Sequence, residues 1–445
     1  MKDTWLSTWT PEDESFWENS GKKIAWRTLT ITTISLVISF CTWYIMSVIV
    51  VRLPQIGFTY TKMQLFWLAA MPGLAGGTLR IIHTFLVPVF GTRKVIIVAT
   101  LLKLIPCIGI GIVVRDVNTS FAVFMVLAFM LGFGGGDFSS YMPSTSIFFP
   151  KRLQGTALGI QAGIGNFGVS LAQFLTPWII GFSVFGGLGG GPQTLTKAGE
   201  TSSVWLQNAS YIYIIPLIIM TAVSWWKLKS VPIKASFREQ FDIFHIKHTW
   251  FCTVTYLMTF GIFAGLSAVF PLLTNILYGG FDGAPDPLKY AFYGPLVGSL
   301  TRILFGPVTD KFGGAILTHI TGIALIICLF ALIFMGLLTP VSVDQFPAFL
   351  TVILFIFFFT GIGNAATFRQ FPVIFSSSPR QAAGVIGWTA AIAAYGPFLF
   401  SILIGYTIEA AGNTIPFFYG LIVLCVIATS INWWYYTRKG CEKPS

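Results

Sequence analysis

Charged side chains are scarce in this sequence: Asp, Glu, Lys and Arg together make up 10% of its 445 residues. A soluble domain carries about 25%, so this chain lacks the charge that a water-exposed surface of its size requires. Hydrophobic residues make up 55%, and the mean hydropathy is +0.77. Apolar runs of about twenty residues, the length of a membrane span, recur along the chain. The composition therefore excludes a soluble globular protein and predicts a chain that crosses a membrane many times.

Several site-forming patterns are also missing. The six cysteines are scattered, with no CxxC pair and no His/Cys spacing suited to a metal. The sequence has no paired histidines for haem, no nucleophile motif and no signalling domain. We therefore expect no disulfide framework, no metal, no cofactor and no enzymatic activity. The polar leader, residues 1–26, lacks the apolar core of a signal peptide, so we expect it to remain at the cytoplasmic face.

Basic residues outnumber acidic ones by 27 to 16, which gives a net charge of +11. In a soluble protein this excess would suggest a nucleic-acid partner, but membrane proteins enrich Lys and Arg in their cytoplasmic loops. The loops on one side of the predicted spans hold only Arg52, Lys62, Arg115, Lys197 and Lys289. Most other basic residues lie on the opposite side with both termini. We therefore expect cytoplasmic termini and no nucleic-acid partner.

Twelve segments are apolar and long enough to span a bilayer. They are residues 27–51, 62–90, 94–115, 119–148, 152–182, 204–228, 248–278, 287–310, 314–337, 346–375, 380–410 and 414–437. A charged stretch in the middle of the chain separates two sets of six. We therefore expect an all-α membrane protein of twelve transmembrane helices in two pseudo-symmetric six-helix bundles. Its predicted parts are the leader 1–26, the N-terminal bundle 27–228, the linker 229–247, the C-terminal bundle 248–437 and the cytoplasmic tail 438–445.

The two halves contain related patterns. Arg80 precedes Gly91 by eleven residues, and Arg302 precedes Gly313 by the same interval. A second set recurs at a spacing of 229 residues. Gly132, Gly134, Pro143, Pro150 and Gly155 return as Gly361, Gly363, Pro372, Pro379 and Gly384. Parallel repeats of six helices are typical of transporters whose halves rock about a central site.

Arg80 and Arg302 are the most informative charges, because eleven helical residues place each about 16 Å from its loop. That is half of a hydrocarbon core of about 30 Å, and a charge at the midplane is costly and points to function. An arginine held by an acid or by carbonyl groups between helices is the alternative. A planar guanidinium donates two parallel hydrogen bonds to paired oxygens. The two arginines therefore predict a midplane site for a small anion.

Three further charges lie inside predicted spans: Lys103, Arg369 and Asp137. For Asp137 we favour a salt bridge to Lys103 or Arg369 over a proton-coupling role, which a buried acid can also serve. His83 follows Arg80 by three residues and so lies near the same helical face. It is either a ligand contact or a packing histidine.

Glycines are the other recurrent feature of the spans. The predicted gating glycines are Gly134, Gly159, Gly163, Gly165, Gly361 and Gly363. Small residues on one face let two helix backbones approach closely, and this packing role is one reading. In the other reading, bare backbone and the amide of Asn166 line a substrate path. The segment GIGNAATF at 361–368 offers the same elements in the second half, with Asn364 and Phe368.

These segments resemble the nitrate/nitrite porter (NarK-type) family of the major facilitator superfamily. The resemblance extends from WTPEDESFWENSGKKIAWR (9–27) through PGLAGGTLR (72–80) and the glycine-rich segment 132–170 to YLMTFGIFAGLSA (256–268), residues 292–314 and residues 361–375. It implies that nitrate or nitrite binds directly to Arg80 and Arg302. It further implies polar contacts from Asn166 and Tyr256, and aromatic walls from Phe138, Phe368 and Phe40.

The sequence departs from the enterobacterial form of this family at Asp137, Arg369, His83 and Lys103. Members of the family without a titratable cavity residue resemble nitrate/nitrite exchangers, whereas others resemble proton symporters. We expect exchange of nitrate and nitrite by alternating access, in a bacterial inner membrane and as a monomer. The alternatives are nitrate/proton symport through Asp137 or His83, or a facilitator for another small anion.

Overall fold

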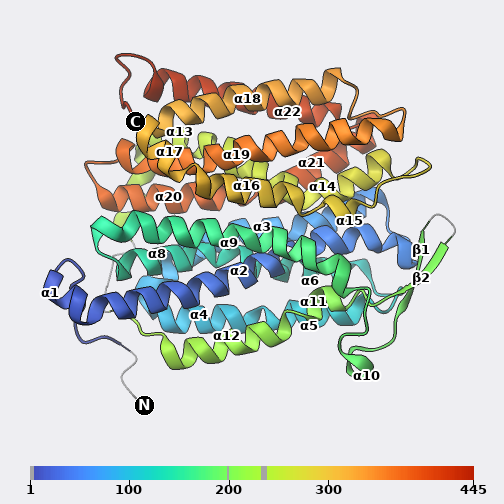
Figure 1. The fold of residues 1–445 in the computed structure, drawn as a ribbon, viewed down its shortest axis with the longest axis horizontal. Helices are drawn as coiled ribbons and strands as arrows, with labels where there is room; N and C mark the ends of the chain where they lie inside the picture. Colours follow the sequence, from blue (N-terminus) through green and yellow to red (C-terminus); the bar gives the residue numbers. More distant parts are fainter. Residues whose placement is uncertain (1–4, 198–199, 232–237) are drawn as a thin grey trace.

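The computed structural model describes residues 5–197, 200–231 and 238–445. Part of the predicted linker 229–247 and the first four residues of the predicted leader therefore lie outside the described residues. Long helices run side by side, with the first half of the sequence on one side and the second half on the other (Figure 1). Both described ends of the chain lie at one end of the helices, and a β-hairpin lies at the opposite end (Figure 1).

The first half consists of helical passes, several of them interrupted. Its elements are α1 (Glu14–Phe16), a π-helical turn (Trp17–Gly21), α2 (Lys22–Arg52), a 3-10 turn (Pro54–Ile56), α3 (Lys62–Phe90), α4 (Thr92–Leu102), α5 (Leu104–Val113), α6 (Phe121–Leu131), α7 (Phe133–Gly136), α8 (Phe138–Phe148), α9 (Lys151–Ile179), α10 (Gly186–Gly189), β1 (Gln193–Lys197), β2 (Glu200–Val204), α11 (Asn208–Tyr211) and α12 (Ile214–Lys227).

The second half follows the same plan without strands among its described residues. Its elements are a 3-10 turn (Arg238–His245), α13 (Lys247–Tyr256), a π-helical turn (Leu257–Gly261), α14 (Ile262–Tyr278), α15 (Pro287–Tyr290), α16 (Tyr293–Leu304), α17 (Gly306–Phe312), α18 (Gly314–Phe334), a 3-10 turn (Val343–Gln345), α19 (Phe346–Ile374), α20 (Pro379–Ala393), α21 (Gly396–Ala411), α22 (Ile415–Asn432) and a final π-helical turn (Trp433–Thr437).

Within the described part of the chain, ten helical passes are long and apolar enough to cross a membrane. Two predicted spans lie outside this set, α9 and the pair α16–α17. Helix α9 is 29 residues long but carries the buried polar residues Gln161, Asn166 and Gln173, and it packs between α2 and α16. Together with these two helical segments, the described residues contain the twelve segments that the sequence predicts. The predicted all-α fold is therefore confirmed, and the chain is a multi-pass membrane protein.

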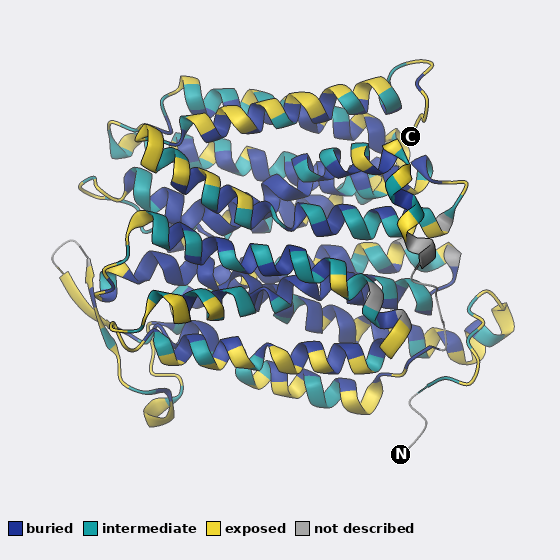
Figure 2. Ribbon diagram, turned by 180° about the vertical axis from the view of Figure 1, so that it is seen from behind, coloured by how far each residue is buried: buried dark blue, intermediate teal, exposed yellow. Residues whose placement is uncertain are grey.

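Buried residues line the inner faces of the helices, and exposed residues lie on the outer helices and at the helix ends (Figure 2). Many of the exposed residues are large and apolar. Examples on the outer surface are Ile82 in α3, Trp226 in α12 and Ile327 in α18, which are 50%, 76% and 62% exposed. Exposed large apolar residues are costly in water but are suited to a lipid environment. Gln161, Asn166 and Gln173 of α9 are instead completely buried. The chain thus faces lipid with apolar side chains and keeps its polar ones between helices.

Two predicted boundaries are wrong in detail. The first helical pass begins at Glu14 rather than near residue 27, because Asp13 accepts hydrogen bonds from the backbone of Ser15 and Phe16 and so caps the helix. The pass that contains Arg302 is not continuous to Gly313, because it breaks at Phe305 between α16 and α17. The predicted depth of Arg302 assumed one unbroken helix as far as Gly313, and the structure has two helices there.

The paired glycines Gly91 and Gly313 occupy equivalent turns, before α4 and before α18. Their φ angles are +80° and +87°. Side chains with a Cβ atom rarely adopt this conformation, whereas glycine does so at little cost. The predicted repeat therefore has a structural cause at both positions, because each glycine allows a sharp turn between two neighbouring helices.

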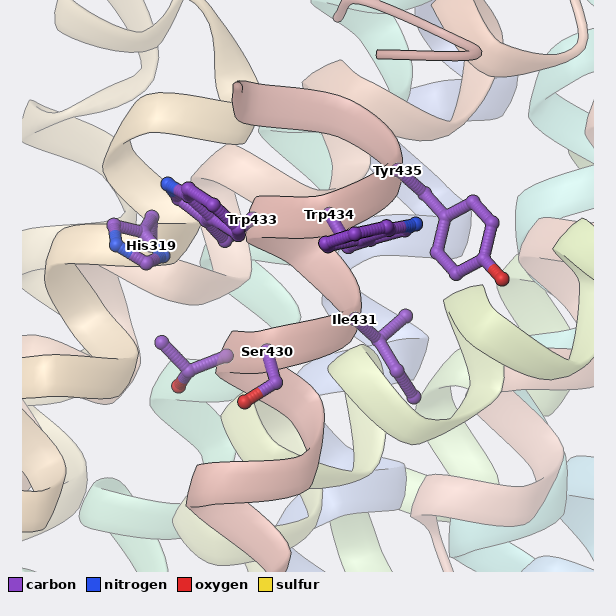
Figure 3. Close-up of a pocket in the computed structure, with 7 residues that line it drawn as sticks. His319, Ser430, Ile431, Trp433, Trp434 and Tyr435 are labelled. Atoms are coloured by element: carbon purple, nitrogen blue, oxygen red, sulfur yellow. The ribbon is translucent and has the colours of Figure 1, made fainter.

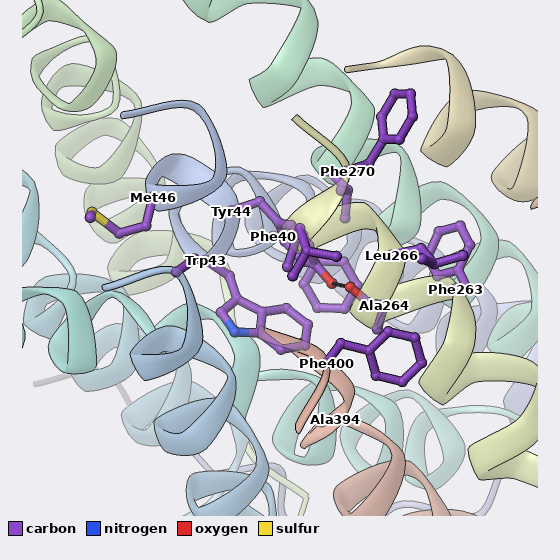
Figure 4. Packing of buried hydrophobic residues seen from close by; sticks show 14 of the residues in the cluster. Phe40, Trp43, Tyr44, Met46, Phe263, Ala264, Leu266, Phe270, Ala394 and Phe400 are labelled. Atoms are coloured by element: carbon purple, nitrogen blue, oxygen red, sulfur yellow. Dashed lines mark hydrogen bonds between the residues drawn. The ribbon is translucent and has the colours of Figure 1, made fainter. Parts of the chain in front are cut away.

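The two halves contact each other closely between the middle of the helices and the hairpin end. The Tyr44 hydroxyl of α2 donates a hydrogen bond of 3.1 Å to the Ala264 carbonyl of α14 (Figure 4). Gln173 of α9 donates to the Ser267 carbonyl at 2.8 Å. Farther along, Arg52 forms an ion pair of 2.8 Å with Asp286, just before α15. These contacts join the halves at the end opposite the chain termini.

Candidate functional site

Arg80 lies at the contact between the two halves and is completely buried. Its Nε donates a hydrogen bond of 2.8 Å to the Gly135 carbonyl of α7, in its own half. Its Nη1 donates one of 2.8 Å to the Ala390 carbonyl of α20, in the other half. Its Nη2 is buried and has no hydrogen-bond partner among the described residues. Two donors therefore hold the guanidinium in place while a third remains free to bind a ligand.

Four aromatic rings surround the Arg80 guanidinium. The distance from its Cζ to the ring centroid is 4.7 Å for Phe138, 5.2 Å for Trp43, 5.5 Å for Phe260 and 5.9 Å for Phe40. Contacts of this kind stabilise a desolvated cation. Phe138 and Phe40 are the walls that the family resemblance implied. Trp43 and Phe260 are additional contacts that the sequence did not identify.

Arg302 is 6% exposed and lies at the end of α16. Its Cζ lies 4.7 Å from the centroid of the Phe368 ring. Both of its Nη atoms are buried and have no hydrogen-bond partner within the described residues. An unpaired buried donor on a charged group costs free energy. The guanidinium thus presents two unused donors, the arrangement that a bidentate anion requires.

A stack of three rings connects the surroundings of the two arginines. Tyr256 lies between Phe260, at 5.4 Å with an interplanar angle of 4°, and Phe368, at 5.1 Å and 17°. Phe260 contacts Arg80, and Phe368 contacts Arg302. The Tyr256 hydroxyl interacts electrostatically with both guanidinium groups. The charges of Arg80 and Arg302 also interact with each other. The predicted residues Arg80, Arg302, Tyr256 and Phe368 are therefore part of one site.

Two buried amides add further unused polar atoms. Asn166 and Asn364 are 0% and 1% exposed, and neither Oδ1 nor Nδ2 of either residue has a hydrogen-bond partner among the described residues. Asn364 lies one helical turn before Phe368 in α19, so the two share a helix face. The sequence named Asn364 as the counterpart of Asn166 through the repeated GIGN pattern, although only Asn166 was also implied by the family resemblance.

Asp137 lies beside this site in a buried polar cluster. Its Oδ2 forms an ion pair with the Lys103 ammonium and accepts a hydrogen bond of 2.6 Å from Ser39. Lys103 also donates to the Ser39 hydroxyl at 2.8 Å. The Nδ1 of His83 is 3.9 Å from the other carboxylate oxygen, Oδ1, and lies within hydrogen-bond distance, 2.9 Å, of the Ser140 hydroxyl. We call this group the Asp137 cluster, and its members are Asp137, Lys103, Ser39, Ser140 and His83.

Arg369 does not belong to this cluster, although we considered it a possible partner of Asp137. It lies near the end of α19, its side chain is 44% exposed, and its Nε forms an ion pair of 2.8 Å with Asp310 of α17. The sequence placed it too deep because the predicted apolar span, residues 346–375, continues for six residues beyond it. Among the three further buried charges predicted from the sequence, Lys103 and Asp137 are fully buried and Arg369 is not.

The predicted gating glycines divide into two groups. For five of them, a Cβ atom added to the glycine would overlap a neighbouring helix or turn. The nearest groups are the Ser39 carbonyl for Gly134, Ile303 for Gly163, Leu36 for Gly165, the Gly298 carbonyl for Gly361 and Thr259 for Gly363. Gly159 is exposed, and an added Cβ would meet no atom within 4 Å. Close packing therefore explains the five in this conformation, but not Gly159.

A surface hollow of about 690 Å³ lies away from the two arginines, at the ends of α18 and α22. Its lining includes His319, Ser430 and the aromatic residues of the final π-helical turn (Figure 3). Exposed Trp and Tyr side chains near helix ends are typical of a membrane interface. The residues that hold the buried arginines do not line this hollow. We therefore assign the candidate site to the interior between the two halves.

Comparison with known proteins agrees with this architecture. The profile of the Major Facilitator Superfamily matches residues 32–388. A solved bacterial homologue of the human lysosomal transporter Spinster, in an inward-facing and unoccupied conformation, has a similar fold. The TM-score is 0.67, with 18% sequence identity over 93% of this chain and 97% of that one. The likeness shows that the two chains share a fold.

Two curated proteins are similar in sequence over nearly their whole length. The probable nitrate/nitrite antiporter NarK2 of Thermus thermophilus is 58% identical over 100% of this chain and 99% of its own. The nitrate/nitrite transporter NarU of Escherichia coli (strain K12) is 36% identical over 98% of this chain and 96% of its own. The chain therefore belongs to the major facilitator superfamily and, within it, to the NarK-type nitrate/nitrite porter family.

Proposed function

We propose that this chain carries nitrate and nitrite across the membrane by alternating access, and that it exchanges one anion for another. The observation that carries the proposal is the set of unpaired guanidinium donors, Nη2 of Arg80 and both Nη atoms of Arg302. Nitrate and nitrite are small planar anions whose paired oxygens match the guanidinium fork. The names of the two relatives, a nitrate/nitrite antiporter and a nitrate/nitrite transporter, support the same substrates.

The anion lies between the two arginines, with one guanidinium from each half. Arg302 provides two donors and Arg80 provides one, because the other Arg80 donors are bonded to Gly135 and Ala390. The amides of Asn166 and Asn364 supply further hydrogen bonds. The rings of Phe138, Phe368 and Phe40 exclude water, which strengthens each charged hydrogen bond.

The charge of the site favours exchange. Without an anion, the buried site holds two positively charged guanidinium groups. Moving one half against the other then carries both charges through a medium of low dielectric, which is costly. A bound anion offsets part of this charge. The loaded site therefore reorients more readily than the empty one, and one anion leaves only when another returns.

Contacts at Tyr44–Ala264, Gln173–Ser267 and Arg52–Asp286 join the two halves at the end opposite the chain termini. The excess of Lys and Arg near the termini supports a cytoplasmic location for them. The end that holds the termini then lies on the cytoplasmic side of a bacterial inner membrane.

One observation favours proton symport as a second candidate mode. The Oδ1 atom of Asp137 is buried without a hydrogen-bond partner among the described residues, and His83 Nδ1 lies 3.9 Å from it. A proton on His83 would be attracted to this oxygen. The ion pair between Asp137 and Lys103 opposes the symport mode, because it already offsets the carboxylate charge.

Uptake into proteoliposomes distinguishes exchange from symport. We expect nitrate uptake to rise about tenfold or more when nitrite is present inside, on the scale of a typical coupling free energy. An imposed pH gradient without internal anion is expected to have little effect. Vesicles with internal gluconate serve as the control for the ionic content. Strong uptake driven by an inward proton gradient alone would contradict obligate exchange and support symport.

A further inference from the structure

The segment from Gly135 to Phe138 contacts Arg80 on both sides of Asp137. The Gly135 carbonyl accepts the Arg80 Nε hydrogen bond, and the Phe138 ring lies 4.7 Å from the Arg80 Cζ. Asp137 lies at the junction of α7 and α8, between these two contacts. Any shift of Asp137 therefore moves both groups that hold the guanidinium.

Asp137 is itself fixed from two other passes. Lys103, at the junction of α4 and α5, forms the ion pair, and Ser39 of α2 donates a hydrogen bond to the same carboxylate oxygen. Lys103 and Ser39 are also hydrogen-bonded to each other, at 2.8 Å. All three side chains are completely buried. The three groups form a closed triangle that attaches the Gly135–Phe138 segment to α2 and to the α4–α5 junction.

We propose that the Lys103–Asp137 ion pair is a positioning element that aims the free Nη2 of Arg80 at the bound anion. This inference rests on the proposed function, because it requires Arg80 to bind the anion. The pair is neutral as a whole, so it fixes the segment without adding net charge near the site. A hydrophobic replacement of both partners also keeps the net charge, whereas removal of one partner leaves a lone buried charge.

The loss of each partner has a different consequence. Without Lys103, the carboxylate of Asp137 is a lone buried negative charge, and the Gly135–Phe138 segment loses its attachment to the α4–α5 junction. Without Asp137, Lys103 is a lone buried positive charge, and the segment loses its attachments to both Lys103 and Ser39. The other titratable groups around Asp137 are His83 of α3 and Tyr141 of α8.

The test is nitrate binding to purified protein by isothermal titration calorimetry, for Lys103→Met, Asp137→Asn, the double variant and Lys103→Arg. We expect at least about tenfold weaker binding for Lys103→Met, because it leaves an uncompensated buried charge. The double variant also lacks the ion pair that positions the segment, so it is expected to bind nitrate as weakly as the single variants, whereas Lys103→Arg keeps the pair and is expected to bind nearly as the wild type does. Asn432→Leu is the matched control, because it breaks buried hydrogen bonds to Gln370 and Ala315 at the far side of the second half.

Rescue by Lys103→Arg separates positioning from a loss of stability alone, because it restores the ion pair to Asp137 at the same place in the fold. Thermal unfolding of each variant shows which ones are folded, and Asn432→Leu is expected to lose stability without losing affinity.

Each outcome decides the inference. Unchanged nitrate affinity in Lys103→Met overturns it, as does a folded double variant that binds as tightly as the wild type. Weak binding by a folded double variant, together with nearly wild-type binding by Lys103→Arg, supports it even if Lys103→Met alone does not fold. A wild-type chain that binds no nitrate overturns both this inference and the proposed function. A wild type that binds nitrate, with a Lys103→Met variant that binds equally well, overturns only the positioning role.

Discussion

Replacing Arg302 with Gln is expected to abolish nitrate and nitrite exchange. Both Nη donors of Arg302 are unused by the protein, so the change removes the charge and the paired donors that face the anion. Two hydrogen bonds to a charged group contribute about 3 kcal/mol or more, which corresponds to a loss of affinity of about 100-fold or more. The measurement is counterflow of nitrate against nitrite in proteoliposomes.

The effect on stability is expected to be small, because Arg302 forms no hydrogen bond through these two atoms. Its thermal unfolding midpoint should therefore stay near that of the wild type. Arg369→Gln is the matched control, because Arg369 is also a basic residue beside the second-half site but pairs with Asp310 in an exposed position. Exchange that survives in Arg302→Gln, or that disappears equally in Arg369→Gln, would contradict the assignment of the anion site.

Gly134→Ala is expected to destabilise the chain and to reduce exchange strongly. A Cβ atom at position 134 would overlap the Ser39 carbonyl oxygen of α2 and approach the Thr42 hydroxyl at 2.7 Å. Helix α7 would then have to move away from α2, because the backbone carbonyl of Ser39 cannot rotate aside as a flexible side chain can. Overpacking of this kind costs about 1–3 kcal/mol. The same movement displaces the Gly135 carbonyl that holds Arg80.

Gly159→Ala provides the comparison for this prediction. No atom lies within 4 Å of a Cβ built at Gly159, so its thermal unfolding midpoint is expected to match that of the wild type. The midpoint of Gly134→Ala is expected to fall by several degrees, since about 1 kcal/mol shifts a mid-sized domain by about 2–4 °C. Differential scanning fluorimetry in detergent measures both. Equal midpoints for the two variants would show that α2 and α7 do not pack as closely as described.

Sequence patterns identified the fold and the two central arginines because both have strong local signals. Membrane spans follow from apolar length, and the eleven-residue interval from arginine to a turn glycine occurs in both halves. The structure explains this interval through the positive φ angles of Gly91 and Gly313. The family resemblance added Tyr256, Phe138, Phe368 and Phe40, whose rings all lie in the surroundings of the two guanidinium groups.

Contacts that depend on helix rotation were not predictable in the same way. Phe260 contacts Arg80 from a π-helical turn, Leu257–Gly261, and such a turn shifts the facing of later residues relative to a regular helix. Trp43 is one of 14 tryptophans, so its type alone carried no signal. The pairing of Arg369 with Asp310 involves α17, whose start at Gly306 follows an interruption that the sequence pattern did not reveal.

The central claim is that the two guanidinium forks hold one anion between the halves. Nitrate titration of Arg80→Lys and Arg302→Lys by calorimetry tests it most directly, because each change keeps the positive charge and removes the fork. Losing one charged hydrogen bond is expected to weaken binding by about 10- to 100-fold in each variant. Nitrate affinities equal to that of the wild type in both folded variants would contradict the claim.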